Sequence, residues 1–487
     1  MTKHGNQFIA VIDLGTTGNR SVLFDLQGNE ITKAYSEFPT ATDELKKAEQ
    51  NSEDWWHTTQ HTMQEALAKA KINTKDISAI SVVSQRATLV PLDKDGNPLA
   101  PAITWMDGRI SPSAEQHDAL VKQRTSLRRG LWIKDMQPKV FKQTSKFATP
   151  DAFVYHKLTG KLVSDYSNHD FGLLDLETFK LSDQIGDELG LPVSMWPDVN
   201  PSGTIIGELT SEAAKQTGLA AGTPVVIGGG DQQCSVVGLG VLQQGVAKLT
   251  IGTGTFVVTP IEKVTRDPMG VLFCHPHVLP NQWVLEGVIP GAGTILRWFR
   301  DQFGHIECAV AERLGRDPYD YIVDQAAQSP PGSNGVILFP FFIWSLGVVK
   351  GLGFQHSRAD IARSILEAVA FASRFLIDTM FSAGISIEKL RLDGGGSRSA
   401  VWRQIQCDIL NRKCEKTHVD EGTALGAAII AAVALKHHST IEKAVEAMVH
   451  KTQVHNPDPA TTDIYKTQYS AFQQLIMDNL PEILRHV

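Results

Sequence analysis

Short apolar runs separated by polar or glycine-rich turns open the chain. Residues Phe8 to Asp13 form a first run, which breaks at Gly15-Thr16-Thr17-Gly18. A second run, Ser21 to Asp25, follows and leads into another turn at Gln27-Gly28-Asn29. Runs of this length, bounded by turn residues, predict neighbouring β-strands that form a β-meander.

A helix and a buried strand come next. Asn51 and Ser52 are suited to cap a helix from about Glu53 to Ala70, because their side chains accept hydrogen bonds from free backbone N–H groups. The apolar residues Ile77 to Val83 predict a buried strand. Strands therefore alternate with helices, which indicates an α/β protein.

A second series of strands begins after a long middle region. Val225 to Ile227 leads into Gly228-Gly229-Gly230-Asp231, and Ala247 to Ile251 leads into Gly252-Thr253-Gly254-Thr255. A strand followed by a turn rich in Gly and Thr thus occurs twice, near residues 15 and 253. This repetition suggests two related halves.

The second half continues with the same alternation. Apolar positions at helical spacing predict a helix from about Arg358 to Ser382, which Gly384 ends. A strand, Leu390 to Asp393, leads into a glycine-rich turn and a further helix that begins near Ala400. We place the N-terminal domain at residues 1–242 and the C-terminal domain at residues 243–487.

Composition excludes several classes of protein. The 487 residues suit two large domains better than one, and the net charge of −7 gives no general attraction to nucleic acids or anionic membranes. The longest apolar run, Ala424 to Leu435, is shorter than the roughly 18 residues of a membrane span. Five cysteines without a C-x-x-C pair suit a reducing cytoplasm. We expect a cytoplasmic protein that binds neither nucleic acid nor membrane.

The two Gly/Thr-rich turns are candidates for phosphate binding. Glycine allows the backbone N–H groups to approach a ligand closely, and threonine adds hydroxyl groups. Two such turns can hold one nucleotide, whereas the alternative is that Gly15 and Gly254 only form tight hairpins. The chain has no P-loop, no dinucleotide-binding G-x-G-x-x-G unit and no protein-kinase motifs.

Six segments of the chain together carry a family resemblance. They are Ile12 to Thr17, Gly229 to Gln233, Gly252 to Thr255, Ala362 to Glu367, Asp393 to Arg398 and Glu421 to Ala428. These segments occur in the order seen in the FGGY carbohydrate kinases, and the chain resembles that family over nearly its whole length. The resemblance implies an α/β fold of two actin-like (ribonuclease H-like) domains with an ATP and sugar cleft between them. It also implies that ATP, with Mg²⁺, phosphorylates a sugar hydroxyl.

The resemblance also implies roles for individual residues. Asp231 matches the catalytic base, although an aspartate there is also suited to cap a helix, and Asp13 matches the carboxylate that holds Mg²⁺. Arg20 matches a phosphate-contacting arginine of glycerol kinases, with a surface arginine as the alternative. The segment from Glu421 and the tryptophan Trp402 are expected to be structural. The phosphate-binding residues are Gly15, Thr16, Thr17, Arg20, Gly252, Thr253, Gly254 and Thr255, and the adenosine-binding residues are Gly395, Gly396 and Ser397.

The residues expected to bind the acceptor resemble more than one branch of the family. Arg86 matches glycerol kinases, but the neighbouring Ala87 lacks their carboxylate. Asp107 lies in a W-x-D-x-R segment like that of pentulose kinases, with a loop cap as its alternative role, and Gln232 again resembles glycerol kinases. The predicted substrate-binding residues are Arg86, Asp107, Asp231 and Gln232.

Other segments depart from the family pattern. The chain is shorter than the pattern between Arg124 and Trp132, where a substrate-lining segment is usual, and Trp344 to Lys350 replaces a G-E-R-x-P segment. Arg297 to Asp301 and Pro330 to Ser333 resemble the autoinducer-2 kinase branch. The hypothesis is a xylulokinase-like kinase of a small sugar, ketose or polyol. Its alternatives are an autoinducer-2-type or glycerol kinase and a catalytically silent nucleotide sensor or assembly protein. A homodimer is compatible with all of them.

Overall fold

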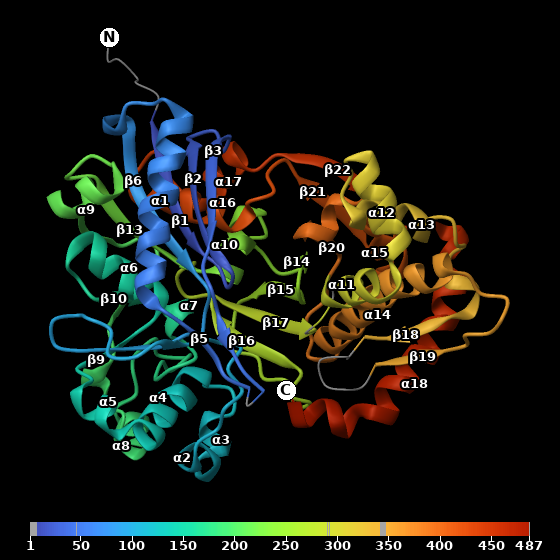
Figure 1. The fold of residues 1–487 in the computed structure, drawn as a ribbon, viewed down its shortest axis with the longest axis horizontal. Coiled ribbons are helices and arrows are strands. Elements are labelled where there is room, and N and C mark those ends of the chain that lie inside the picture. Colours follow the sequence, from blue (N-terminus) through green and yellow to red (C-terminus); the bar gives the residue numbers. More distant parts are fainter. Residues whose placement is uncertain (1–6, 45, 290, 292, 341–346, 487) are drawn as a thin grey trace. The chain divides into compact units, whose positions relative to one another are not determined.

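The computed structural model describes residues 7–44, 46–289, 291, 293–340 and 347–486 (Figure 1). By packing, the chain divides into two compact units. Unit 1 consists of Met1–Gly240, His275–Trp283 and Glu421–Val449, and unit 2 of Val241–Cys274, Val284–Asp420 and His450–Val487. Two segments from the second half of the sequence thus pack within unit 1. Units defined by packing do not test the predicted functional domains, residues 1–242 and 243–487, which remain a proposal.

Unit 1 is built on a six-stranded sheet with the order β12-β13-β6-β1-β2-β3. The first three strands of the chain pair in antiparallel fashion, which confirms the predicted meander, whereas β1, β6 and β13 run parallel. These strands are β1 Phe8–Leu14, β2 Gly18–Asp25, β3 Glu30–Glu37, β6 Ile77–Ser84, β12 Ile205–Glu208 and β13 Pro224–Gly230.

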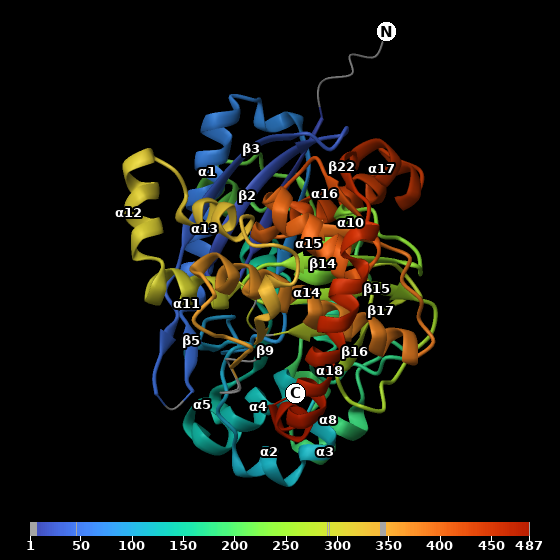
Figure 2. The same cartoon turned by 90° about the vertical axis from the view of Figure 1, so that its right-hand side faces the viewer.

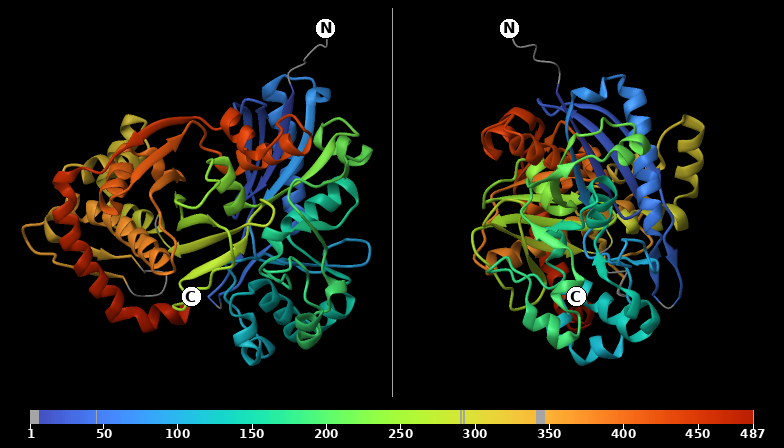
Figure 3. Two further views of the ribbon diagram at one scale, coloured as in Figure 1. Left: turned by 180° about the vertical axis from the view of Figure 1, so that it is seen from behind. Right: turned by 90° about the vertical axis from the view of Figure 1, so that its left-hand side faces the viewer.

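Helices cover both faces of this sheet. The helices α1 (Ser52–Ala70) and α6 (Pro150–Thr159) pack on one face, and α16 (Gly422–Ala434) packs on the other against β1, β6 and β13 (Figures 1 and 3). Alternate residues of β1, from Phe8 to Leu14, belong to the core shared with α1 and α6. Because successive side chains of a strand point to opposite faces, Asp13 lies on the α16 face.

Two helices of unit 1 cross at unusually close range. The helix α10 (Asp231–Gly238) continues directly from β13 and packs against α16. A Cβ atom at Gly238 would overlap the carbonyl oxygen of Gly422 and lie 2.7 Å from the Gly426 nitrogen. A Cβ atom at Gly426 would overlap the carbonyl oxygen of Cys234. The crossing therefore requires glycine, and it brings the C-terminal end of α10 against the N-terminal end of α16.

Unit 2 is built on a seven-stranded sheet with the order β16-β17-β15-β14-β20-β21-β22. The long helix α14 packs on β15, and α15 packs on β21 and α14 (Figure 2). The bounds of α14 match the predicted helix, and β20 and α15 confirm the strand and helix expected after it. These elements are β14 Val246–Ile251, β15 Thr255–Ile261, β16 Leu272–Pro276, β17 Trp283–Ile289, β20 Lys389–Asp393, β21 Lys413–Thr417, β22 Lys451–His455, α14 Arg358–Ser382, α15 Ala400–Leu410 and α18 Thr462–His486.

Shorter elements complete both units. In unit 1 they are β4 Ala41–Thr42, β5 Ala48–Gln50, β7 Val90–Leu92, β8 Ala102–Ile103, β9 Lys146–Ala148, β10 Val163–Asp165, β11 Asp198–Asn200, α2 Pro112–Gln116, α3 Asp118–Val121, α4 Thr125–Met136, α5 Pro138–Gln143, α7 Tyr166–His169, α8 Asp183–Leu189, α9 Ser211–Thr217 and α17 Ile441–Met448. In unit 2 they are α11 Gly293–Phe303, α12 His305–Leu314, α13 Pro318–Ala326, β18 Ile337–Phe339 and β19 Val348–Lys350. None of the described helices combines the length and apolar character that crossing a membrane requires.

The buried imidazole of His169 makes stability depend on pH. Burial lowers the pKa of His169 to about 4, and its ring packs edge-on against Trp196. In the unfolded chain the same ring has a pKa near 6.5 and takes up a proton as the pH falls below that value. Because the unfolded state then binds more protons than the folded state, the free energy of unfolding decreases as the pH is lowered.

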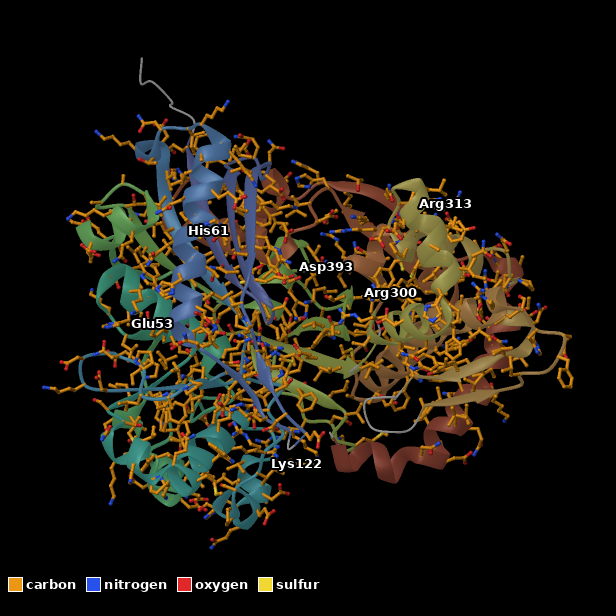
Figure 4. All side chains as sticks on the ribbon, in the orientation of Figure 1. Glu53, His61, Lys122, Arg300, Arg313 and Asp393 are labelled. Carbon is orange, nitrogen blue, oxygen red and sulfur yellow. The ribbon has the colours of Figure 1, made fainter. Side chains whose placement is uncertain are left out.

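We therefore expect His169→Leu to remove part of this pH dependence. Between pH 7.5 and pH 5, the free energy of unfolding should fall by about 2 kcal/mol less in the variant than in the unmodified protein. Urea unfolding at the two pH values measures the difference. His61→Leu is the matched control, since His61 is exposed on α1 and hydrated in both states (Figure 4). Equal pH dependence in the His169 variant and the unmodified protein would contradict the assignment.

Candidate active site

The carboxyl ends of three parallel strands bring predicted site residues of unit 1 together. Leu14, Ser84 and Gly230 lie in register on β1, β6 and β13. Asp13 and Asp231 each lie one position from these residues, and Arg86 lies two positions beyond Ser84. Segments far apart in the sequence therefore supply one group of charged side chains at one edge of the sheet.

Asp13 lies in an environment that suits a bound cation. Its side chain is 6% exposed, and burial raises the pKa of Asp13 to about 7. The Arg20 guanidinium, 3.6 Å away, opposes this effect, whereas the charges of Glu421 and Asp231 add to it. The described residues contain no cluster of three or more metal-ligating side chains. A single carboxylate fits Mg²⁺, which usually binds one or two carboxylates together with water and phosphate oxygens.

Arg20 is held by ion pairs on both sides. Its Nη1 lies 3.6 Å from the Asp13 carboxylate, and its Nε lies 3.6 Å from that of Glu421, the residue that precedes α16. Glu421 also binds Lys33 of β3 at 3.1 Å, and the Arg20 guanidinium lies over the Tyr35 ring. Arg20 is therefore not an isolated surface residue. Its contacts hold a partly exposed guanidinium beside Asp13.

The first Gly/Thr turn is a tight hairpin that keeps one hydroxyl at the surface. Gly15 N–H donates to the Gly18 carbonyl at 3.0 Å, and the Thr16 hydroxyl accepts from the Trp105 indole at 2.9 Å. Thr17 is exposed, and its hydroxyl lies 3.3 Å from that of Tyr35. The hairpin and phosphate-binding interpretations are therefore compatible at this turn.

Asp231 occupies the first position of α10 and is 32% exposed. Gly230, not Asp231, holds the N-cap position, so the alternative role as a helix cap is wrong. The Asp231 carboxylate accepts from the backbone N–H of Gln232 at 2.8 Å. Gly230 N–H in turn donates to the Ser167 hydroxyl at 2.8 Å, which fixes the chain just before the carboxylate.

Arg86 lies beside Asp231 with its side chain largely buried. Its Nε is 3.4 Å from Asp231 Oδ1, and its guanidinium packs against the Phe171 ring. The next residue, Ala87, has a φ of 56°, in the left-handed region that non-glycine residues rarely adopt. The amide of Gln232 lies 3.5 Å from the other Asp231 oxygen. Arg86, Asp231 and Gln232 therefore form one polar group.

Asp107 does not belong to this polar group, because its carboxylate is bound by other residues. Its side chain is 2% exposed, and the Arg109 guanidinium donates to both of its carboxylate oxygens, at 2.7 and 3.0 Å. The backbone N–H groups of Ala48 and Arg109 donate to it as well. With both oxygens engaged, this geometry favours the loop-cap role for Asp107 over sugar binding.

The second Gly/Thr turn, in unit 2, is also a hairpin. Gly252 N–H donates to the Gly254 carbonyl at 3.0 Å, and the Gly293 N–H donates to the Gly252 carbonyl at 2.8 Å. Thr253 is exposed, whereas Thr255 is fully buried and its hydroxyl has no hydrogen-bond partner among the described residues. Of the two hydroxyls, only that of Thr253 lies at the surface.

The glycine-rich loop after β20 has one open position. Asp393, labelled in Figure 4, ends the strand, and Gly394 follows with a φ of 81°. A Cβ atom at Gly395 would meet nothing within 4 Å, whereas one at Gly396 would lie 2.8 Å from the Trp402 ring. The Ser397 hydroxyl donates to the Gly394 carbonyl at 2.7 Å and so closes the turn.

Comparison with known proteins identifies the family. The model of the FGGY family of carbohydrate kinases, N-terminal domain, matches residues 8–238, and that of the C-terminal domain matches residues 247–435. The chain belongs to the FGGY family of carbohydrate kinases. It is an α/β protein with the two actin-like, ribonuclease H-like domains of that family and is a phosphotransferase. FGGY kinases use ATP as the phosphate donor, generally with Mg²⁺.

Relatives with different substrate names resemble this FGGY kinase about equally. A xylulose kinase of Staphylococcus epidermidis is 28% identical over 484 residues, which cover 95% of each chain. An autoinducer-2 kinase of Escherichia coli is 30% identical over 502 residues, which cover 97% of this chain and 94% of the relative. The crystal structure of a xylulose kinase from Rhodospirillum rubrum superimposes with a TM-score of 0.85 at 25% identity and covers 98% of this chain and 99% of that chain.

Sequence reasoning missed several contacts of this FGGY kinase site. The segment from Glu421 was expected to be structural, and its helix does pack closely against α10, but the pairs of Glu421 with Arg20 and Lys33 were not predicted. No local sequence pattern predicts such pairs, because their members lie hundreds of residues apart in the sequence. Trp402 is buried in the core, as expected. Of the segment Trp344 to Lys350, residues 344–346 lie outside the described residues.

Substitution of the open glycine in the loop tests nucleotide binding. Gly395→Val is expected to abolish detectable ATP binding while the protein stays folded, because the new side chain projects into open space instead of into the core. Calorimetric titration with ATP and thermal unfolding measure the two effects. Gly395→Ala is the matched control. Its side chain is smaller than that of valine, so it should weaken ATP binding less. Undiminished ATP binding by the Gly395→Val protein would count against the adenosine site.

Proposed function

We propose that this FGGY kinase transfers the γ-phosphoryl group of ATP to a hydroxyl of a small ketose or polyol, with Asp231 as the general base. The observation that carries the proposal is the partly exposed Asp231 carboxylate, held at the start of α10 with the Arg86 Nε 3.4 Å away. A carboxylate on a rigid support, beside a hydrogen-bond donor for the acceptor, suits proton removal from an attacking hydroxyl.

In the proposed reaction, the acceptor oxygen attacks the γ-phosphorus of ATP, Asp231 accepts the hydroxyl proton, and the bond between that phosphorus and ADP breaks so that ADP leaves. Arg86 and Gln232 hydrogen-bond neighbouring oxygens of the acceptor and hold the attacking hydroxyl toward Asp231. The Gly230 N–H bond to Ser167 keeps the carboxylate in place during the transfer. Phosphoryl transfer depends mainly on such positioning and on charge stabilisation.

Charged groups of unit 1 are proposed to bind the phosphates. Arg20, Thr16 and Thr17 contact phosphate oxygens, with Arg20 held by its pairs with Asp13 and Glu421. Asp13 is the proposed Mg²⁺ ligand. When bound, Mg²⁺ neutralises negative charge on the phosphate oxygens.

Loops of unit 2 are proposed to bind the nucleotide. The exposed backbone at Gly395 and the Thr253 hydroxyl supply contacts, and the remaining residues shape the loops. Ser397 contributes through the turn that its hydroxyl closes. Thr255, Gly252 and Gly254 set the conformation of the second hairpin.

The proposed acceptor has three to five carbons, such as xylulose or a short dihydroxy-ketone. Its polar partners reduce to Arg86, Asp231 and Gln232, because Asp107 is engaged by Arg109 and Ala87 is apolar. An additional hydroxyl without a partner would cost roughly 1 to 3 kcal/mol. The names of the relatives, xylulose kinase and autoinducer-2 kinase, agree with an acceptor of this size.

An ADP-release assay over a panel of acceptors tests this proposal. The panel contains glycerol, erythrulose, xylulose, ribulose, fructose, tagatose and glucose, and a three- to five-carbon compound is expected to have the highest kcat/KM. With that acceptor, Arg86→Ala should raise KM more than it lowers kcat, whereas the exposed Arg313→Ala is the matched control and should change neither (Figure 4). A hexose or hexulose as the best acceptor would contradict the proposed substrate class. If no acceptor of the panel causes ADP release, the result would favour a catalytically silent nucleotide sensor.

A further inference from the structure

An aromatic ring packs against the Arg86 guanidinium. The Arg86 guanidinium lies 5.3 Å from the centroid of the Phe171 ring, which is itself only partly buried. Cations are attracted to the face of an aromatic ring, so this contact holds the guanidinium in the position where its Nε meets Asp231. Phe171 thus lies next to the acceptor-binding group of unit 1, although no sequence motif pointed to it.

Residues at the start of α4 fix the backbone around Phe171. The Phe171 carbonyl accepts from the Ser126 N–H at 2.9 Å, at the start of α4. Arg124 donates to the carbonyls of Gly172 at 2.8 Å and Leu174 at 3.0 Å. The segment after Arg124, where the sequence predicts a shortened substrate-lining segment, therefore contacts the loop that carries Phe171.

A buried pair also contacts the Phe171 ring. The His275 ring lies 5.0 Å from the Phe171 ring at an angle of 39°, and its Nδ1 contacts the Asp170 carboxylate. Both side chains of this pair are buried. A buried acid–imidazole contact limits the rotation of the histidine, and the histidine in turn limits the movement of Phe171.

We propose that Phe171 determines the acceptor specificity of this kinase, an inference that rests on the proposed function. Its ring holds Arg86 beside Asp231, and its exposed part bounds the space next to that guanidinium with apolar carbon. Asp170 and His275 are positioning residues that keep the ring in place. The acceptor packs a C–H face on Phe171, and a ketose one CHOH unit longer must bring a hydroxyl against the ring.

The physical reason for the selectivity is an unmatched hydroxyl. An aromatic face accepts C–H groups well but offers no strong partner to a hydroxyl, which would lose its hydration on binding. Such an unpaired polar group typically lowers kcat/KM by about 10- to 100-fold relative to a well-matched acceptor. Removing the ring admits water that can solvate the additional hydroxyl, so the selectivity should decrease.

Kinetics of Phe171 variants test the inference. The measured quantity is the ratio of kcat/KM for the best of erythrulose, xylulose and ribulose to that for the better of fructose and tagatose. Phe171→Ala is expected to lower this ratio at least about tenfold. Phe171→Leu retains an apolar side chain in case the alanine variant does not fold, and it should raise the KM of the short acceptor because Arg86 loses its aromatic support. The matched control is Phe141→Leu, at a partly buried phenylalanine of α5 that packs against Phe147.

The positioning residues have a separate readout. His275→Ala and Asp170→Asn should lower the same ratio in the same direction as Phe171→Ala, but by a smaller factor. A change in thermal stability without a change in the ratio would overturn their positioning role.

Failure of this inference is distinguishable from failure of the proposed function. Suppose that the unmodified kinase phosphorylates a short ketose, and that the folded Phe171 variants have the same ratio of kcat/KM values and the same KM for the short acceptor. Only the role of Phe171 is then overturned. If the unmodified kinase phosphorylates no member of the panel, the proposed function is contradicted and the inference falls with it.

Discussion

Asp231→Asn is expected to lower kcat by about 10² to 10⁴, which corresponds to roughly 3 to 5 kcal/mol of barrier. Asparagine keeps the size of the side chain and an oxygen that accepts from the Gln232 N–H. It lacks the basic carboxylate that we propose to accept the proton of the attacking hydroxyl. The affinity for ATP should change little, because the loop of unit 2 that is proposed to bind the nucleotide is unchanged.

The measurements are ADP release with the best acceptor and calorimetric titration with ATP. Asp198→Asn is the matched control, since it removes an exposed carboxylate of the same unit and should leave kcat unchanged. Turnover of the Asp231→Asn protein at the rate of the unmodified enzyme would remove Asp231 from the mechanism.

Gly426→Ala should lower the free energy of unfolding by about 3 kcal/mol, at the upper end of what overpacking usually costs. The new Cβ atom would overlap the Cys234 carbonyl oxygen and lie 3.0 Å from the Gly238 nitrogen, and both are backbone atoms of α10. An alanine inside a helix normally stabilises it by about 1 kcal/mol relative to glycine, so destabilisation isolates the clash. Because α10 begins with Asp231, its displacement should also lower kcat.

Urea unfolding and acceptor kinetics measure the two effects of the Gly426 variant. Gly395→Ala provides the comparison for stability, because its Cβ atom meets no other atom within 4 Å and should change unfolding little. A Gly426→Ala protein as stable and as active as the unmodified enzyme would show that the close helix crossing does not hold Asp231 in place.

Local patterns were sufficient to predict the elements that frame the site. The runs from Phe8 to Asp25 became the antiparallel strands β1 and β2, and the strand that ends in Gly230 became β13. The side chain of Asn51 caps α1, as its type and position indicated. Each of these features depends on residues that are neighbours in the sequence, so periodicity and turn chemistry are enough to find them.

Features that depend on distant pairing were not predictable in the same way. The segment from Glu421 to Val449 packs within unit 1, and this places Glu421 beside Arg20. Asp107 has the residue type of a sugar ligand, but the Arg109 guanidinium two residues later engages it. Phe171 and His275 meet from separate segments. In each case the partner, not the residue type, decides the role.

Phosphorus NMR of a reaction mixture is the most direct test of the central claim that this FGGY kinase phosphorylates a small ketose or polyol. The mixture contains the enzyme, ATP, Mg²⁺ and the short acceptor that gives the fastest ADP release. We predict that a new phosphomonoester signal appears in step with ADP, and that the Asp231→Asn protein produces it far more slowly. Formation of inorganic phosphate without a phosphomonoester, or ATP that stays intact with every acceptor of the panel, would contradict the account.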